Sequence, residues 1–287
     1  MPENPVPTTP AGTSAANSPV LSLIVLTNFF PAAEKALRYA ASLAAPVNAQ
    51  VVLLHVREAT VLEGELLPPS EEEHADLRAA LQALADEIYV PTAIELAPDL
   101  QLSTATELAE RFGPAVFVLG HAEEASAEEE VSEAVLDVLR SGRFPLLLVP
   151  ETYAGAATPA HVMVAADGEP FTLEHPGAAL QLLSRLHPRL TVVTVSADRD
   201  DRICATALHQ VKASGLGAVG RHVTPEAIRH RDPVEGLLQA VPLNAADLVV
   251  LIARRRSFLS EMFHRSVSNR LLRASPVPVL LLPALEA

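Results

Sequence analysis

Residues 278–283, PVLLLP, repeat residues 145–150, PLLLVP, with the two prolines in the same frame. A shift of 133 positions relates the two stretches, and it also places residues 116–119 (VFVL) on residues 249–252 (VVLI) without a gap. Two apolar runs of strand length that match at one shift, with the prolines at the same relative positions, are hard to obtain by chance. We therefore interpret the chain as a tandem repeat of one unit.

Outward from this repeat, apolar runs of strand length alternate with segments of helical period. Such alternation predicts βαβ units, and right-handed crossovers then give a parallel sheet that is covered on both faces. We predict an α/β fold with two tandem, doubly wound, parallel five-stranded sheets that form a pseudo-dimer. The expected strands are residues 21–26, 51–56, 92–96, 116–119, 144–149, 161–165, 190–195, 218–223, 248–252 and 277–282, and the expected helices are residues 32–43, 70–84, 103–112, 131–139, 176–186, 203–213, 234–240 and 267–272.

The repeat also sets the expected domain boundaries. Residues 1–19 are rich in Pro, Thr, Ser and Ala, and we expect a disordered tail there. Domain 1 then comprises residues 20–151 and domain 2 residues 160–285, with residues 152–159 as the linker. Each half is long enough to bury a core of its own.

The net charge of −14 is concentrated in the first half. Residues 1–159 hold seven Lys and Arg against 23 Asp and Glu, whereas residues 160–287 hold 14 against 12. Because acidic surfaces repel phosphate backbones and anionic lipids, we expect neither nucleic acid nor membranes as partners. The start of the chain lacks the pattern of a signal peptide, and no apolar stretch approaches the roughly 20 residues of a membrane span. We expect a cytoplasmic protein, in which the single cysteine, Cys204, is a small buried hydrophobe.

The motifs at the two ends of the second half resemble the universal stress protein family. The family opens on a strand that ends in an acidic residue, often Asp-Gly-Ser, and residues 162–168 read VMVAADG. It closes on a helix that starts Ser-Val-Ser and a Pro-Val-Pro-Val strand, and residues 266–268 (SVS) and 276–279 (PVPV) match that pattern. The resemblance implies the adenine-nucleotide α-hydrolase-like fold and, for many members, ATP binding.

In ATP-binding members, three glycines and a Ser or Thr surround the phosphates. Glycine lets the backbone approach a phosphate closely, and the helix start that follows offers free N–H groups. The spacing is kept in the second half, but Ile252, Arg255 and Arg265 take the glycine places, and of that pattern only Ser266 is retained. Because a β-branched residue is strained where φ must be positive, we expect this loop to take another shape.

The residues expected near the adenine match the family pattern better than those expected near the phosphates. The family's acidic residue corresponds to Asp167, and its valine after the second strand corresponds to Val195. We therefore name Asp167, Val195, Arg255, Arg265 and Ser266 as candidate ligand-binding residues, in domain 2 only.

In the first half, the corresponding places hold residues that do not favour a nucleotide. Asn28 replaces the acidic residue and Glu133 replaces the Ser or Thr, although Val56 matches the valine. Leu119, Ala122 and Ser132 stand at the glycine places, and the nearby glutamates would repel a triphosphate. We expect no nucleotide in domain 1.

Three hypotheses for the function follow. The first is a non-catalytic stress-response or regulatory protein that acts through protein contacts and does not bind ATP in the usual mode. By analogy with the family, the last strands of the two halves, residues 145–149 and 278–282, would pair or pack across the pseudo-twofold, which would also cover an apolar edge. The chain could pair further into a homodimer. The second is a sensor that binds ATP, AMP or another anion through domain 2, where the arginines would attract the charge. The third, a nucleotide-dependent ligase or transferase, is the weakest because we find no arrangement of residues that could act as a catalytic site.

The spacing of the ten histidines does not indicate a metal site, and the first hypothesis implies no cofactor.

Overall fold

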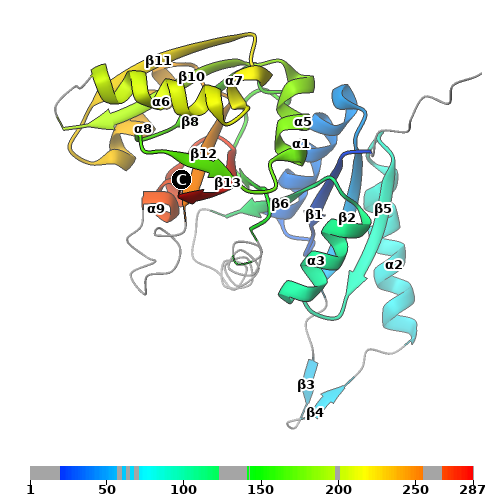
Figure 1. Cartoon of the computed structure of the whole chain (residues 1–287). Helices are drawn as coiled ribbons and strands as arrows, with labels where there is room; N and C mark the ends of the chain where they lie inside the picture. Colours follow the sequence, from blue (N-terminus) through cyan, green and yellow to red (C-terminus); the bar gives the residue numbers. More distant parts are fainter. Residues whose placement is uncertain are drawn as a thin grey trace, which may run out of the picture.

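The computed structural model describes residues 20–56, 60–62, 65–67, 71–122, 141, 143–197, 201–254 and 267–286. The expected tail at residues 1–19 and the expected helix at residues 131–139 lie outside them. In the described part the two halves lie side by side, as Figure 1 shows.

Domain 1 is built on five parallel strands. They are β1 (Ser22–Leu26), β2 (Gln50–Val56), β5 (Thr92–Ala97), β6 (Ala115–His121) and β7 (Leu146–Pro150), in the spatial order β5-β2-β1-β6-β7. The described helices are α1 (Pro31–Val47), α2 (Glu71–Asp86) and α3 (Leu102–Arg111). A short hairpin of β3 (Thr60–Leu62) and β4 (Glu65–Leu67), which we did not predict, follows β2.

Domain 2 repeats this topology. Its parallel strands are β8 (His161–Ala165), β10 (Arg189–Ser196), β11 (His222–Arg229), β12 (Leu248–Arg254) and β13 (Val279–Glu286), in the order β11-β10-β8-β12-β13. The described helices are α5 (Gly177–Leu186), α6 (Asp201–Ala213), α7 (Leu216–Val219), α8 (Pro233–Leu243) and α9 (Val267–Ala274). Strand β9 (Phe171–Leu173) is an addition after β8 that has no counterpart in domain 1 and pairs antiparallel with the end of β13. The predicted α/β fold of two five-stranded repeats is confirmed.

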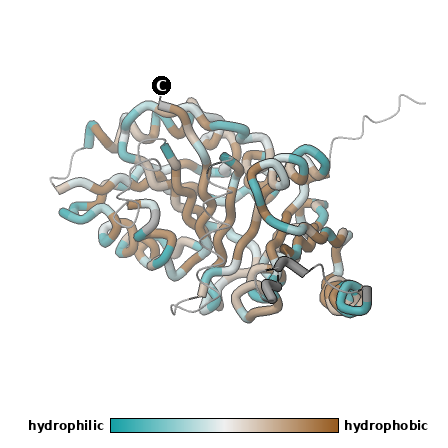
Figure 2. The backbone as a smooth tube through the Cα atoms, turned by 90° about the horizontal axis from the view of Figure 1, so that it is seen from below, coloured by the Kyte–Doolittle hydropathy of each residue, from teal (hydrophilic) through white to brown (hydrophobic). Residues whose placement is uncertain are grey.

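The two sheets join into one through their last strands. Strands β7 and β13 pair antiparallel, with Leu148 opposite Val279 and Leu146 opposite Leu281, which confirms the predicted pairing across the pseudo-twofold. Helix α1 also packs against α5 across the interface. Figure 2 shows the apolar strands running through the middle of both halves, where most side chains of the core are fully buried.

Polar contacts also cross between the domains. The guanidinium of Arg143, just before β7, forms a half-buried ion pair with Glu174, which follows β9. Tyr39 on α1 packs edge to face against Tyr153 of the expected linker, with ring centroids 5.7 Å apart. The Tyr153 hydroxyl donates to the carbonyl of Ala156 at 3.0 Å. The segment between the domains is therefore held to the body of the protein by a buried tyrosine.

Local sequence signals explain several element ends. Helix α1 begins with Pro31 in its first turn, where a missing N–H costs nothing, and ends at Asn48 in the left-handed conformation. Helix α8 begins at Asp232, whose carboxylate accepts from the backbone N–H of Val234 at 2.8 Å and of Glu235 at 3.4 Å.

The prediction for residues 218–223 is wrong. Gly215, with φ of 93°, starts the short helix α7 instead, and the strand β11 lies further on, at His222–Arg229. This strand contains Pro225, which lacks the backbone N–H that a central strand would need. It is tolerated because β11 is an edge strand, paired only with β10 among the described strands, so that its missing N–H breaks no central ladder.

Candidate functional site

The carboxyl ends of β8, β10 and β12 surround a cavity of about 250 Å³ in domain 2. Strand β8 is the first strand of its repeat and lies between the second and the fourth, β10 and β12. The chain therefore leaves neighbouring strands toward opposite faces of the sheet at this point, and open α/β sheets bind ligands in the crevice that results. The fold itself places the cavity where a ligand is expected.

Two of the predicted site residues meet at this cavity. Asp167 follows β8 and Val195 lies near the end of β10, and both line the wall. The Asp167 carboxylate accepts a hydrogen bond from the backbone N–H of Glu169 at 3.1 Å and so shapes the turn after the strand. Gly168 between them has φ of 85°, a conformation that favours glycine.

The other three predicted residues, Arg255, Arg265 and Ser266, lie outside the described residues. Ile252, which takes the first glycine place of the family pattern, is among the described residues. It lies inside β12 and pairs with Leu282. Strand β12 therefore runs on to Arg254 instead of turning at the place where the family pattern has its first glycine. This extended strand avoids the strain that we expected from a β-branched residue at a positive φ.

Arg254, the last residue of β12, carries the most consequential contact of the site. Its Nη2 donates to the Asp167 carboxylate and its Nη1 to Glu169 Oε2 at 2.6 Å. The arginine side chain is 13% exposed, whereas the two carboxylates are mostly exposed. Its buried Nε has no hydrogen-bond partner among the described residues. The carboxylate that corresponds to the family's adenine-side residue is thus already bound by a cation of the same chain.

Apart from Ser268, the other residues that line the cavity have apolar side chains. Val193 on β10, Leu237 on α8 and Leu251 on β12 contribute to it, together with Phe171 on β9. Phe171 and Glu169 both belong to the segment that domain 2 inserts between β8 and its first helix. Domain 1 lacks this insertion, since α1 begins only three residues after Asn28. Sequence reasoning missed both residues, and the unequal distance to the next helix in the two halves was the signal that could have indicated them.

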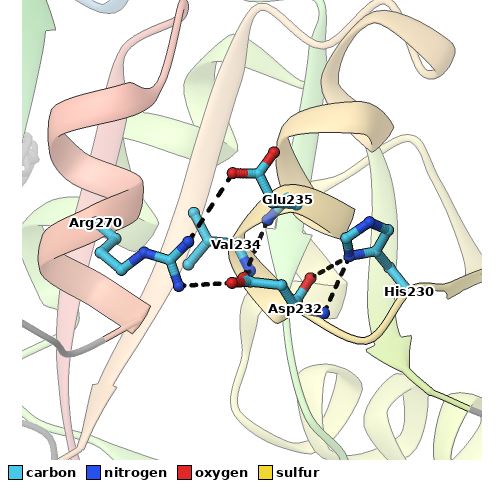
Figure 3. A network of polar contacts seen from close by, with 5 residues as sticks. All are labelled: His230, Asp232, Val234, Glu235 and Arg270. Carbon is cyan, nitrogen blue, oxygen red and sulfur yellow. Dashed lines mark hydrogen bonds and ion pairs between the residues drawn. The ribbon is translucent and has the colours of Figure 1, made fainter.

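Polar contacts join α9 to the start of α8, and Figure 3 shows the residues that make them. Arg270 on α9 donates to the Asp232 carboxylate at 2.8 Å, and Asp232 caps α8. The backbone N–H of Asp232 lies 3.1 Å from Nδ1 of His230. The hydrogen bond from Arg270, with those from the N–H groups of Val234 and Glu235, holds the pKa of Asp232 below its ordinary value. The helix whose buried Ser268 lines the cavity is therefore fastened to α8.

Comparison with known families identifies this domain. Residues 159–283 match the model of the universal stress protein family. Domain 2 therefore matches the universal stress protein family. No curated protein matches the sequence.

Solved structures extend the likeness to both halves at the level of the fold. A universal stress protein from Archaeoglobus fulgidus DSM 4304 is 17% identical, with a TM-score of 0.61, over 91% of this chain and 97% of that chain. A putative universal stress protein from Pseudomonas aeruginosa UCBPP-PA14 is 16% identical, with a TM-score of 0.54, over 92% and 94%. The cytoplasmic domain of a prokaryotic cation chloride cotransporter is 13% identical, with a TM-score of 0.56, over 92% and 95%.

The corresponding place in domain 1 has a similar turn but no carboxylate. Asn28 accepts from the backbone N–H of Phe30 at 3.3 Å, as Asp167 does from Glu169. Phe29 adopts a φ of 63° where domain 2 has Gly168, and its ring lies 5.4 Å from that of His55. Two partly exposed aromatic rings thus replace the charged turn.

Three further observations concern the described residues. Among them, no group of three or more His, Cys, Asp or Glu side chains could hold a metal ion. None of the helices in this part of the chain combines the length and apolar character needed to cross a bilayer. Cys204 is buried and free, as expected.

Proposed function

We propose that this universal stress protein is a non-catalytic stress-response or regulatory protein of the cytoplasm, which acts through contacts with other proteins and does not bind ATP in the usual mode of its family. The observation that carries the proposal is the contact of Arg254 with Asp167 and Glu169. A base that approached Asp167 would have to displace a guanidinium held by two carboxylates. The replacement of the loop glycines by Ile252, Arg255 and Arg265 points the same way.

The test is thermal unfolding of the full chain with ATP, ADP, AMP and cyclic nucleotides, each with and without Mg²⁺. A ligand that binds only the folded state adds about 2.7 kcal/mol of stability at a concentration of about 100 times its Kd. We expect no change in the melting temperature of the wild-type protein. A rise with any of these nucleotides at millimolar concentration would overturn the proposal.

Two variants show which feature prevents binding. Arg254→Ala releases the Asp167 carboxylate, and Arg229→Ala is the matched control, since Arg229 is exposed and lies on the edge strand β11. If Arg254 blocks the adenine end, Arg254→Ala gains a nucleotide-dependent rise in melting temperature and Arg229→Ala does not. If neither variant responds, the loss of affinity lies in the loop that replaces the glycines.

The alternative is a sensor that binds an adenine nucleotide or another anion in domain 2. The arginines at positions 254, 255, 256 and 265 favour it, because guanidinium groups bind anions strongly. Titration calorimetry of the wild-type protein with AMP and with inorganic phosphate decides between the two. Heat of binding that saturates at one site would support the sensor, and its absence would support the non-nucleotide function.

Self-association is a further part of the proposal. The edges of the joined sheet are β5 and β11, and either could contact a second copy. Light scattering coupled to size exclusion gives the molar mass in solution. A mass near twice the 30.5 kDa of one chain is expected for the homodimer, and a mass of one chain would exclude it at that concentration.

A further inference from the structure

Two successive phenylalanines of domain 1 stand where the local backbone favours other residues. Phe29 has a φ of 63°, a left-handed conformation that is costly for a bulky side chain and that glycine adopts freely. Phe30 is the N-cap of α1 and makes no side-chain hydrogen bond there, although Ser, Thr, Asn and Asp are the residues that stabilise this position. Sequences generally satisfy such local preferences, except where function requires another residue. The two phenylalanines therefore point to a role outside folding.

Both rings are open to solvent at the edge of domain 1 where its parallel strands end. Phe29 is 38% exposed and Phe30 43%, and they follow the end of β1. Leu102, which is 45% exposed, begins the helix that follows β5 and therefore lies at the same edge. The ring of His55, near the end of β2, lies 5.4 Å from that of Phe29. Exposed apolar side chains that gather at one edge are typical of a surface that binds another protein.

The charges at this edge are mostly negative. Each of the helices α1, α2 and α3 begins there, and their first eight residues, 31–38, 71–78 and 102–109, hold six Asp and Glu against three Lys and Arg. Asp99, which is exposed, adds a carboxylate between β5 and α3. Residues 1–159 as a whole hold 23 Asp and Glu against seven Lys and Arg. A partner that carries Lys or Arg beside its apolar side chains would therefore be attracted to this edge.

The same charge argues against the other partners that an apolar surface could bind. Nucleic acids and anionic membranes would be repelled. A second copy of this chain would bring an equally acidic edge to the contact, so self-association through the phenylalanines is opposed as well. A basic protein segment with apolar side chains on one face can contact the rings and the carboxylates together.

We propose that Phe29, Phe30 and Leu102 form a docking surface on domain 1 for a basic, amphipathic segment of another protein. The inference rests on the proposed function, because it assigns a surface and a partner chemistry to the protein contacts proposed there. The rings supply apolar area that the partner covers, and the carboxylates around them favour its Lys and Arg side chains. Domain 1 would then bind the partner at the place that corresponds to the charged turn of domain 2.

Synthetic peptides test the chemistry of the partner. The protein contains no tryptophan, so the emission of a tryptophan in a peptide reports binding to the full chain without background. The probe has about 15 residues of Leu and Lys with one Trp, and its apolar residues lie on one face of a helix. One control peptide has the same composition with the apolar residues spread around the helix, and another has Glu in place of Lys. We expect the probe to bind at least about ten times more tightly than either control, with an affinity that falls as salt is added. Equal binding of the first control, or no binding of the probe, would overturn the proposal.

Variants place the surface. Phe29→Gly and Phe30→Asn each remove a ring and introduce a residue that the backbone favours at that position, so both proteins should fold. Tyr89→Ala is the matched control, since Tyr89 is 99% exposed and lies at the opposite edge of domain 1, before β5. We expect each phenylalanine variant to weaken binding of the probe at least about fivefold and Tyr89→Ala to leave it unchanged. Unchanged binding in both phenylalanine variants would refute the assigned surface.

Two further measurements separate the other outcomes. If light scattering shows a dimer that Phe29→Gly and Phe30→Asn dissociate, the surface binds a second copy, and the basic partner is wrong. A rise of the melting temperature with a nucleotide overturns the proposed function whatever the peptides do. Failure of the probe to bind, in a protein that also does not respond to nucleotides, overturns the docking surface alone.

Discussion

Replacing Tyr39 with phenylalanine tests whether burial at the domain interface keeps this phenol protonated and makes the stability of the protein depend on pH. The Tyr39 side chain is 4% exposed, lies against Tyr153 at the domain interface, and has a hydroxyl without a hydrogen-bond partner among the described residues. Burial, reinforced by the negative charges that Tyr153 and Asp247 can carry, raises the pKa of Tyr39 above its ordinary value. Burial and Asp247 also raise the pKa of Tyr153, to about 12.

The sign and the size of the effect follow from linkage. Because the folded protein keeps Tyr39 protonated, its contribution to stability is complete below about pH 10 and is lost as the pH rises above the pKa of the unfolded chain. At pH 11, about one unit above that value, the loss is about 1.4 kcal/mol, however far the folded pKa is raised beyond 12. Phenylalanine cannot ionise and therefore avoids this loss. At pH 8 the variant should already gain about 1 kcal/mol, since an unpartnered buried hydroxyl is removed.

The assay is urea unfolding followed by circular dichroism at pH 8 and at pH 11, for the wild type, Tyr39→Phe and Tyr89→Phe. Tyr89 is 99% exposed, so its variant removes the same hydroxyl without touching the interface. We expect the advantage of Tyr39→Phe over the wild type to grow by about 1.4 kcal/mol between the two pH values. If the advantage is the same at both, burial does not hold this phenol in its protonated form, and the reasoning is wrong.

Two further predictions concern single positions in the fold. A Cβ at Gly120 would lie 2.0 Å from the carbonyl oxygen of Ala32, so Gly120→Ala should lower the unfolding free energy by about 3 kcal/mol or more, and a loss below about 1 kcal/mol in urea unfolding would contradict this packing. Asp232→Ala removes the cap of α8 and the partner of Arg270, so it should lower the melting temperature at pH 7. Because those contacts depress the pKa of Asp232, the difference from the wild type should shrink as the pH falls below about 4, and a difference of constant size at pH 7 and pH 3 would argue against the ion pair.

The periodicity of the sequence was sufficient to predict the sheet. Apolar runs bounded by prolines and glycines mark buried parallel strands whatever their neighbours are. The resemblance to the family, together with the need to cover an apolar edge, implied that the last strands would pair or pack, and they do pair. The prediction was wrong for the strand expected at residues 218–223, where the sequence is compatible with more than one structure. Pro225 excludes a central strand but not an edge strand, and which of the two applies depends on the order of strands in space. The three residues of β9 are too few to show any period.

The part of the candidate site that belongs to recognisable sequence motifs could be predicted. Asp167 and Val195 were placed by their distance from strand ends, and both line the cavity. The pairing of Arg254 with Asp167 was beyond such reasoning, because 87 positions separate the two residues and the contact depends on how far β12 continues. Which side chains meet across a sheet depends on the register of strand pairing and on strand length. Neither can be read from a single sequence.

The antiparallel contact of β7 with β13 has a consequence for how the two copies could diverge. In a symmetric dimer of identical chains, every substitution at the twofold appears twice and must fit a copy of itself. With both halves in one chain, each side of that contact can change alone. The ion pair between Arg143 and Glu174 occurs once, and the position that corresponds to Arg143 in the other half is Pro276. A change in one half therefore needs no matching change in the other, and the segment with β9, which is present in domain 2 and absent from domain 1, is an example of such an asymmetry.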